Sequence, residues 1–86
     1  MLESVEGMHH DAFDRLTPRE RQVLEMTARG LTNRQIADGL VVTVHAIKFH
    51  LAMIYRKLNV ANRTEAAFLY LNRSAQASTT GREDVT

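Results

Sequence analysis

The sequence contains no cysteine, and it has only one proline and four glycines among its 86 residues. Without cysteine the chain forms neither a disulfide framework nor a thiolate metal site, which excludes the disulfide-stapled class of secreted proteins. The longest apolar run is only a few residues, so we expect no membrane span. The N-terminal residues include Glu3, Glu6 and Asp11 and lack the basic-then-apolar pattern of a signal peptide. These absences favour a cytosolic protein.

The length allows one domain with a small core, which is marginally stable unless its helices pack tightly or the chain dimerises. The net charge of +1 conceals an uneven distribution. Residues 17–73 carry nine Lys and Arg against four Asp and Glu, a net +5, whereas residues 1–16 carry −3 and residues 74–86 carry −1. A basic central segment favours a polyanionic partner, although a solvated charged face is the simpler alternative.

The first helix is indicated at Thr17-Pro18-Arg19-Glu20. Thr17 is a suitable N-cap, Pro18 suits the first helical position, and Glu20 completes a capping box. Gly30 is placed to end this helix, because glycine accepts the positive φ that a helix terminus requires.

A second capping box, from Thr32 to Gln35, predicts a short helix that ends near Leu40. The small Ala37 on its inward face would let the next helix cross close to it. Thr43 is the expected cap of that next helix, which ends near Asn59.

A third capping box, Asn62-Arg63-Thr64-Glu65, begins a fourth helix. No alternating apolar pattern indicates a strand, and no internal repeat is present. The predicted fold class is therefore all-α, with four helices that include a helix-turn-helix. We assign residues 16–72 to this domain, residues 1–15 to a partly flexible leader or linker, and residues 73–86 to a disordered tail.

The helix predicted over residues 44–58 has two faces of opposite character when it is read at 100° per residue. Its inner stripe is apolar and consists of Ile47, Leu51, Ile54 and Leu58. Its outer side carries His45, Phe49, Ala52 and Arg56, flanked by Lys48 and Met53. This mixture of cations, hydrogen-bonding groups and apolar atoms is typical of a recognition surface. In a helix-turn-helix the second helix enters the DNA major groove, although small helical bundles can imitate the spacing.

Two runs of the sequence, LTPRERQVLEMTARGLTNRQIADGL and KFHLAMIYRKLNVANRTEA, resemble the DNA-binding domain of the LuxR/GerE family of bacterial transcription regulators. The resemblance covers about residues 16–71 without a gap. It implies a four-helix domain of the C-terminal effector type, whose third helix enters the major groove and whose fourth helix commonly forms a dimer. It also implies a sequence-specific regulator that binds double-stranded DNA as a dimer on two half-sites, in the bacterial cytoplasm and on the nucleoid when bound.

Two residues depart from the family pattern. Ala46 precedes Ile47 where the family usually has Thr-Val, and the missing hydroxyl removes a possible phosphate contact. Val41 lies in the turn where helix-turn-helix motifs often have glycine. Since a β-branched residue disfavours positive φ, we expect the turn to follow a different path here.

The family match predicts base contacts from the outer side of the third helix. Lys48 is able to donate to guanine O6 and N7 or to a phosphate, and Phe49 and Ala52 are suited to a thymine methyl group. A solvated lysine and an aromatic ring folded back on its own helix are the alternatives. The predicted base-contacting residues are His45, Lys48, Phe49 and Ala52.

Helix N-termini with free backbone N–H groups are suited to phosphate, and basic side chains add to them. Capping alone is the alternative explanation for the Thr and Asn residues. His50 is placed beside the apolar stripe, where packing and phosphate contact are both open. The predicted phosphate-contacting residues are Asn33, Arg34, Thr43, Arg56, Lys57, Arg63 and Thr64.

The fourth helix carries the predicted dimer interface at Phe68, Leu69 and Tyr70, because three consecutive residues cannot all face one core. No catalytic constellation is present, so we expect no enzyme and no cofactor. Glu20 is interpreted as a cap and helix-dipole partner. His9-His10 has no further ligands at metal spacing, so no metal site is expected. A second hypothesis is a protein-interaction module in which Phe49 and Met53 dock on a partner such as RNA polymerase.

Overall fold

The computed structural model of the chain describes residues 12–73, and the expectations for the leader and tail fall mostly outside them. The described part contains α2 (Pro18–Ala28), α3 (Asn33–Leu40) and α4 (Val44–Leu58), with further helix over residues 63–73. Residues 12–14 form one additional helical turn that the sequence did not predict. No strand occurs in residues 12–73. The all-α prediction with four helices at these places is confirmed.

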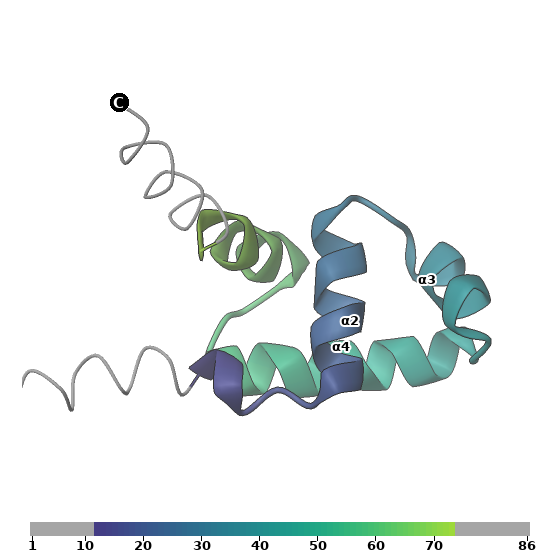
Figure 1. The fold of residues 1–86 in the computed structure, drawn as a ribbon, viewed down its shortest axis with the longest axis horizontal. Coiled ribbons are helices and arrows are strands. Elements are labelled where there is room, and N and C mark those ends of the chain that lie inside the picture. The colour runs from purple at the N-terminus through teal and green to yellow at the C-terminus, as the bar shows by residue number, and fades with distance from the viewer. Residues whose placement is uncertain (1–11, 74–86) are drawn as a thin grey trace, which may run out of the picture.

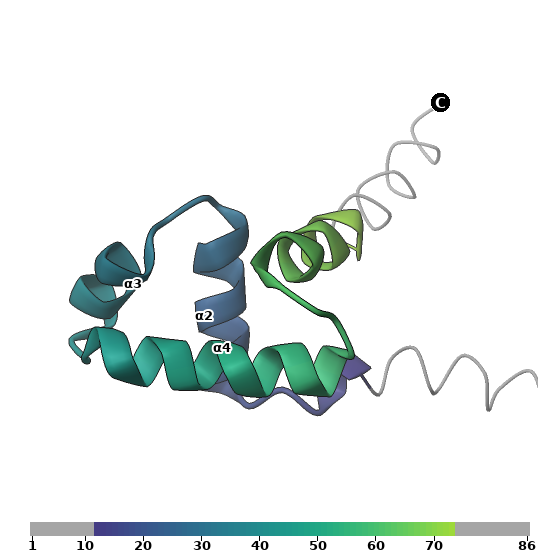
Figure 2. The same cartoon turned by 180° about the vertical axis from the view of Figure 1, so that it is seen from behind.

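Helix α4 is the base on which the other helices are arranged. In Figure 1, α2 crosses α4 steeply, α3 lies at one end, and helix 63–73 lies on the other side of α2. Figure 2 shows α4 lying in front of α2 from the opposite side. The axes of α3 and α4 meet at 108°, within the range of helix-turn-helix motifs. No single helix in the described residues is long and apolar enough to cross a membrane.

The N-termini of α2 and α3 are held by the two predicted capping boxes. Thr17 Oγ1 accepts from Glu20 N at 3.1 Å, and Thr17 N donates to Glu20 Oε1 at 2.9 Å. Thr32 and Gln35 repeat the arrangement at 3.1 and 2.8 Å. Each box satisfies two backbone donors that would otherwise lack a partner. The sequence therefore determines where both helices begin.

The third predicted capping box forms only in part. Asn62 Oδ1 accepts from Glu65 N at 2.9 Å, as expected of an N-cap. The carboxylate of Glu65, however, accepts from Ala61 N at 2.7 Å rather than from Asn62 N. The prediction is wrong in this detail because the Glu65 side chain reaches one residue further back. It thereby fixes the approach of the chain to helix 63–73.

Three helices end in the same way, although three different residue types take the left-handed conformation. Gly30 has φ +93°, and Val41 and Asn59 both have φ +57°. After α2, Gly30 N donates to Thr27 O at 3.0 Å and Leu31 N donates to Met26 O at 3.2 Å. This pair of bonds is the Schellman motif, which satisfies carbonyl groups at a helix C-terminus.

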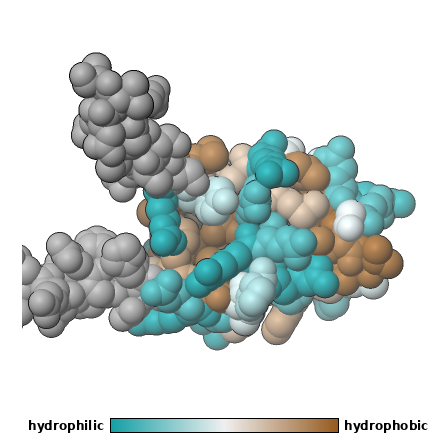
Figure 3. All heavy atoms as spheres, viewed as in Figure 1, coloured by the Kyte–Doolittle hydropathy of each residue, from teal (hydrophilic) through white to brown (hydrophobic). Residues whose placement is uncertain are grey.

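The expectation that Val41 would change the path of the turn is wrong. Val41 has φ +57° and ψ +49°, the left-handed conformation that glycine usually takes. Val42 N donates to Ala37 O at 2.9 Å, which closes the motif around it. The side chain is 89% exposed, so it meets no neighbour that would oppose this conformation. Figure 3 shows hydrophobic atoms at the end of the molecule where α3 turns into α4. The turn keeps its usual shape at a cost of about 1–2 kcal/mol.

The inner stripe of α4 forms the centre of the core, as predicted. Ile47, Leu51, Ile54 and Leu58 are all buried. They belong to one cluster with buried residues of the neighbouring helices: Val23, Leu24, Ile36, Ala37 and Ala66. A Cβ atom added at Gly39 would lie 3.3 Å from Met26 Cε, so this glycine allows α3 to approach α2 closely. The burial of this stripe leaves the other side of α4 exposed.

We predict that Val41→Gly stabilises the protein by about 0.5–1 kcal/mol. The variant removes the left-handed strain and loses no packing, while the greater freedom of glycine in the unfolded chain offsets part of the gain. The measurement is the free energy of unfolding from urea titration. Asn59→Gly is the matched control, because asparagine already tolerates this conformation, and we expect only a small change there. A loss of stability in Val41→Gly would contradict this account.

Candidate nucleic-acid interface

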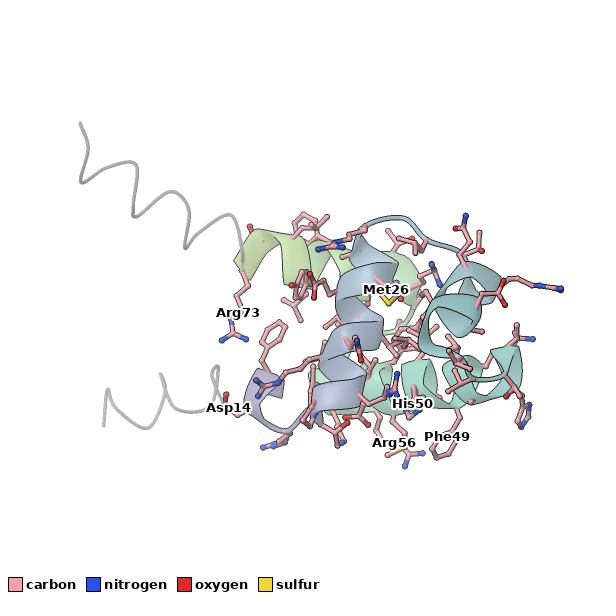
Figure 4. The ribbon with its side chains drawn as sticks, turned by 45° about the vertical axis from the view of Figure 1, so that its right-hand side comes forward. Asp14, Met26, Phe49, His50, Arg56 and Arg73 are labelled. Atoms are coloured by element: carbon pink, nitrogen blue, oxygen red, sulfur yellow. The ribbon has the colours of Figure 1, made fainter. Side chains whose placement is uncertain are left out.

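The predicted base-contacting residues form one continuous exposed stripe on the outer side of α4. His45, Lys48, Phe49, Ala52 and Arg56 are all exposed. Their spacing of three, four, seven and eleven residues from His45 places them on one side of the helix. In Figure 4, Phe49 and Arg56 project from α4 away from α2. The structure thus brings the four predicted base-contacting residues together on a surface that a groove could receive.

The sequence left open whether the Phe49 ring is exposed to a partner or folded back on its own helix, and the structure shows some of both. Its ring meets the ring of His50 edge-on, with 6.1 Å between the ring centres. The side chain nevertheless remains 63% exposed. His50 itself is half-buried, as its place beside the core stripe suggested. An aromatic ring that is packed against one neighbour and still mostly exposed is suited to contact a partner's apolar group.

The charge on this side of α4 is uniformly positive. Helix α4 contains no Asp or Glu over Val44–Leu58. Three ion pairs occur within residues 12–73: Arg21–Asp14, Arg29–Glu25 and Lys57–Glu20. Lys48, Arg56 and Arg34 take part in none of these three. Cations without a carboxylate partner leave a positive potential that attracts an anion.

The N-terminus of α4 retains groups that suit a phosphate. Thr43 Oγ1 accepts from Ala46 N at 3.0 Å, so Thr43 is the N-cap of α4, as predicted. Its hydroxyl hydrogen takes part in no hydrogen bond among the described residues. Thr43 and Arg34 are both exposed. The cap and the phosphate roles of Thr43 are therefore compatible, since each uses a different part of the hydroxyl group.

Lys57 lies differently from the other predicted phosphate ligands. Its Nζ donates to Glu20 Oε1 at 2.8 Å and to Arg15 O at 3.2 Å. Only a quarter of the Lys57 side chain is exposed, and the Glu20 side chain is almost fully buried. The ammonium group therefore joins α4 to the start of α2, which disfavours the predicted contact with phosphate.

The ion pair changes the titration of Glu20. Burial raises the pKa of this carboxyl. Hydrogen bonds from Lys57 and from Thr17 N and the charges of Lys57 and His50 lower it, and their combined effect is larger. The net result is a pKa below the ordinary value of 4.5. Glu20 is a cap, as the sequence indicated, and it is also the anchor for Lys57, which the sequence did not reveal.

Arg63 and Asn33 also lie differently from the prediction, because they bind each other. Arg63 Nη1 donates to Asn33 Oδ1 at 2.7 Å, and Arg63 Nη2 donates to Leu31 O. Thr64, in contrast, is exposed beside them. No spacing in the sequence signals this pair, since 30 residues separate the two side chains. A free guanidinium is therefore not available at Arg63 in this structure.

The predicted dimer residues separate into two groups. Phe68 is 67% exposed, whereas Leu69 and Tyr70 are half-buried and pack against the core. Leu71, which the prediction omitted, is 50% exposed. Phe68 and Leu71 are three residues apart and so share one side of the helix. This exposed apolar pair is the part of helix 63–73 that is available to a partner.

A hollow lies away from the α4 stripe, between residues 12–14, α2 and helix 63–73. Phe13, Leu24 and Tyr70 are among the residues that line it. The guanidinium of Arg73 covers the Phe13 ring at 4.3 Å from its centre. Figure 4 shows Asp14 and Arg73 at the end of the molecule opposite α3. The hollow therefore forms no part of the candidate nucleic-acid interface.

The fold and the exposed, basic second helix together define a helix-turn-helix protein. The family model described as bacterial regulatory proteins of the luxR family matches residues 14–70. The chain belongs to this family, and its predicted family membership is confirmed.

Similar curated proteins are transcription regulators. The nitrate/nitrite response regulator NarP of Escherichia coli is 44% identical over 71 residues, which cover 81% of this chain and 33% of NarP. The transcriptional regulatory protein ComA of Bacillus subtilis is 45% identical over 56 residues, which cover 65% of this chain and 26% of ComA. The chain thus spans about a third or less of these relatives.

Two solved structures share the fold. The response regulator StyR superposes with a TM-score of 0.74 and 35% identity, covering 83% of this chain and 36% of that one. The DNA-binding domain of ComA, in a complex with the anti-activator RapF, gives a TM-score of 0.60 and 45% identity. That match covers 62% of this chain and 91% of that domain.

We predict that the Glu20–Lys57 pair makes stability depend on pH below about 4.5. A carboxyl whose pKa is lowered by folding stabilises the protein fully above its unfolded pKa, and this contribution is lost as the pH falls through the folded pKa. Glu20→Gln should lower stability by about 1–2 kcal/mol at pH 7, because the cap remains but the charge pair is lost. The measurement is the melting temperature of both proteins from pH 7 to 3. The difference between the melting temperatures of Glu20→Gln and the wild type should narrow as the pH falls.

Glu25→Gln is the matched control for this prediction. Glu25 pairs with Arg29 at 2.7 Å on the exposed surface of α2, where an ion pair contributes little. Its melting temperature should stay close to the wild type throughout. Parallel pH profiles for Glu20→Gln and the wild type would show that the pair does not control acid stability.

Proposed function

We propose that this chain is a sequence-specific, double-stranded DNA-binding transcription regulator that inserts α4 into the major groove. The observation that carries the proposal is the exposed side of α4, the second helix of a helix-turn-helix, whose cations Lys48 and Arg56 have no ion pair among the described residues. The family and the transcription regulators among its relatives support the same function.

The roles of the stripe follow from its chemistry. Lys48 donates to guanine O6 and N7, and Phe49 and Ala52 contact thymine methyl groups. His45, in the first turn of α4, reaches a neighbouring base edge. These four residues choose the sequence, because only groups on base edges distinguish one base pair from another.

The phosphate contacts fix the position of α4 in the groove. Thr43 donates its hydroxyl hydrogen at the start of α4, and Arg34 and Arg56 approach the backbone from either side. Asn33 and Thr64 add neutral donors. Since each neutralised phosphate releases counterions, the affinity falls steeply as the salt concentration rises.

We further propose that two copies bind two half-sites through Phe68 and Leu71 on helix 63–73. Both side chains are large, apolar and at least half exposed, and burial against a second copy would remove that surface from water. Leu69 and Tyr70 support the interface from within, because they pack against the core. A two-fold dimer places two α4 helices on one side of the duplex.

Docking of a partner protein on the α4 face is the second candidate function. It is favoured by the 63% exposure of Phe49, and the similar ComA domain is found in complex with the anti-activator RapF. The absence of acidic residues from α4 favours DNA over a protein of mixed charge. Competition between DNA and a candidate partner for wild-type protein distinguishes the two functions.

We predict that Lys48→Ala loses sequence-specific DNA binding while its melting temperature stays within a degree or two of the wild type. Lys48 is exposed and has no ion pair among the described residues, so only the partner contact is lost. The measurement is titration of selected DNA fragments at two salt concentrations. One bidentate base contact accounts for about 1–3 kcal/mol of discrimination, or roughly five- to 150-fold in affinity ratio.

Arg21→Ala is the control for Lys48→Ala. It removes the same charge from a residue that lies beside Phe13 and Asp14 rather than on the α4 stripe. We expect normal discrimination between DNA fragments. Equal losses in the two variants would mean that net charge, and not the stripe, determines binding.

We predict that Phe68→Glu prevents dimer formation, because a carboxylate at a buried apolar interface must be desolvated. The measurement is sedimentation of the protein alone and with DNA that carries two half-sites. Gln22→Glu adds the same charge to an exposed residue of α2 and should leave assembly unchanged. A wild-type protein that stays monomeric both free and on DNA would rule out the dimer.

A further inference from the structure

The guanidinium of Arg63 joins the start of helix 63–73 to the start of α3. Arg63 Nη1 donates to Asn33 Oδ1 at 2.7 Å, and Nη2 donates to the carbonyl of Leu31 in the turn before α3. Both accepting groups lie within two residues of the α3 N-cap, Thr32. One side chain therefore ties together parts of the chain that are about 30 residues apart.

The hydrogen bond to Asn33 has a consequence for the polarity of that side chain. An amide has one accepting oxygen and one NH2 group with two donors. Because Oδ1 is held by Arg63, the NH2 group of Asn33 must point away from the guanidinium. Its donors take part in no hydrogen bond among the described residues. Asn33 is half-exposed at the first residue of α3, so this end of the amide is the one that an approaching anion meets.

We propose that Arg63 is a positioning residue, which orients Asn33 and the N-terminus of α3 toward a DNA phosphate without contacting DNA itself. This inference rests on the proposed function. It replaces the expectation that Arg63 is a phosphate ligand, because both ends of its planar fork are already bound within the protein. Without Arg63 the amide is free to rotate, and it would then also turn its carbonyl oxygen toward the phosphate, which repels it.

The choice of arginine is explained by the two bonds. Its fork has donors in a fixed plane and reaches the Leu31 carbonyl and the Asn33 amide together, whereas lysine has a single ammonium group. A lysine at this position offers its donors from one nitrogen rather than from a planar fork, so it would hold the two acceptors less firmly. This difference provides a graded test in which Arg63→Lys keeps the charge and Arg63→Met removes it.

The test compares Arg63→Met, Arg63→Lys, Asn33→Ala and the double variant Arg63→Met/Asn33→Ala with the wild type. DNA affinity is measured at several salt concentrations, well below the melting temperature of each variant. We expect Arg63→Met to weaken binding about three- to tenfold, as for the loss of one hydrogen bond, and Arg63→Lys to weaken it less. The slope of log affinity against log salt concentration should equal that of the wild type. The double variant should bind DNA no more weakly than whichever single variant, Arg63→Met or Asn33→Ala, binds more weakly.

Asn33→Asp separates positioning from stability. An aspartate at this place binds Arg63 at least as strongly, so the melting temperature should equal or exceed that of the wild type. It lacks the NH2 donors and brings a negative charge to the phosphate, so DNA affinity should fall. A purely structural role for the pair would leave the affinity of this stable variant unchanged, which would overturn the proposal.

Four further results would also overturn it. A slope that becomes shallower by about 0.9 in Arg63→Met would identify Arg63 as a phosphate ligand. Wild-type affinity in folded Arg63→Met, or additive losses in the double variant, would show that Arg63 does not act through Asn33. If the wild type binds no DNA at all, the proposed function itself fails, and the role of Arg63 fails with it.

Discussion

The burial of one apolar stripe on α4 is the constraint on which the rest of the structure depends. Ile47 and Ile54 are completely buried, and they pack with side chains from α2, α3 and helix 63–73. Because successive residues of a helix are 100° apart, fixing this stripe in the core also fixes which side chains face away from it. The exposure of Lys48, Phe49 and Ala52 is thus a consequence of core packing. The candidate interface needs no separate element to hold it.

The features that could be predicted from the sequence are those that depend on neighbouring residues. Thr17, Thr32 and Thr43 cap helices through bonds to a residue three positions away, so each start is visible in a short segment. The buried apolar stripe of α4 is equally visible, because its residues recur with the period of a single helix. The helical turn at residues 12–14 lacks both a cap signal and a sustained period, which is why it could not be predicted.

The features that could not be predicted depend on residues far apart in the chain. Lys57 and Arg63 looked like free cations, but they bind Glu20 and Asn33 at separations of 37 and 30 residues. Val41 differs, because here the local preference itself was correct: a β-branched residue disfavours positive φ, but the surrounding structure overrides this preference. The burial of α3 and α4 on either side and the two backbone bonds of the Schellman motif impose the left-handed conformation. Propensity is a weak preference, and tertiary packing overrides it where the turn must close.

The placement of carboxylates, rather than the count of cations, determines where this domain is positive. Residues 17–73 carry nine basic side chains, but the carboxylates of α2 pair with Arg29 and Lys57. Since α4 has no carboxylate of its own, Lys48 and Arg56 form no ion pair within residues 12–73, and both lie on the side that core packing exposes. Lys57 is thus used to hold α4 against α2, and Arg29 pairs at the end of α2, whereas Lys48 and Arg56 remain on the exposed side of α4. A search for the reading face of a related small domain should therefore begin with the helix that lacks acids, because net charge alone mixes the cations that stabilise the fold with those that meet a partner.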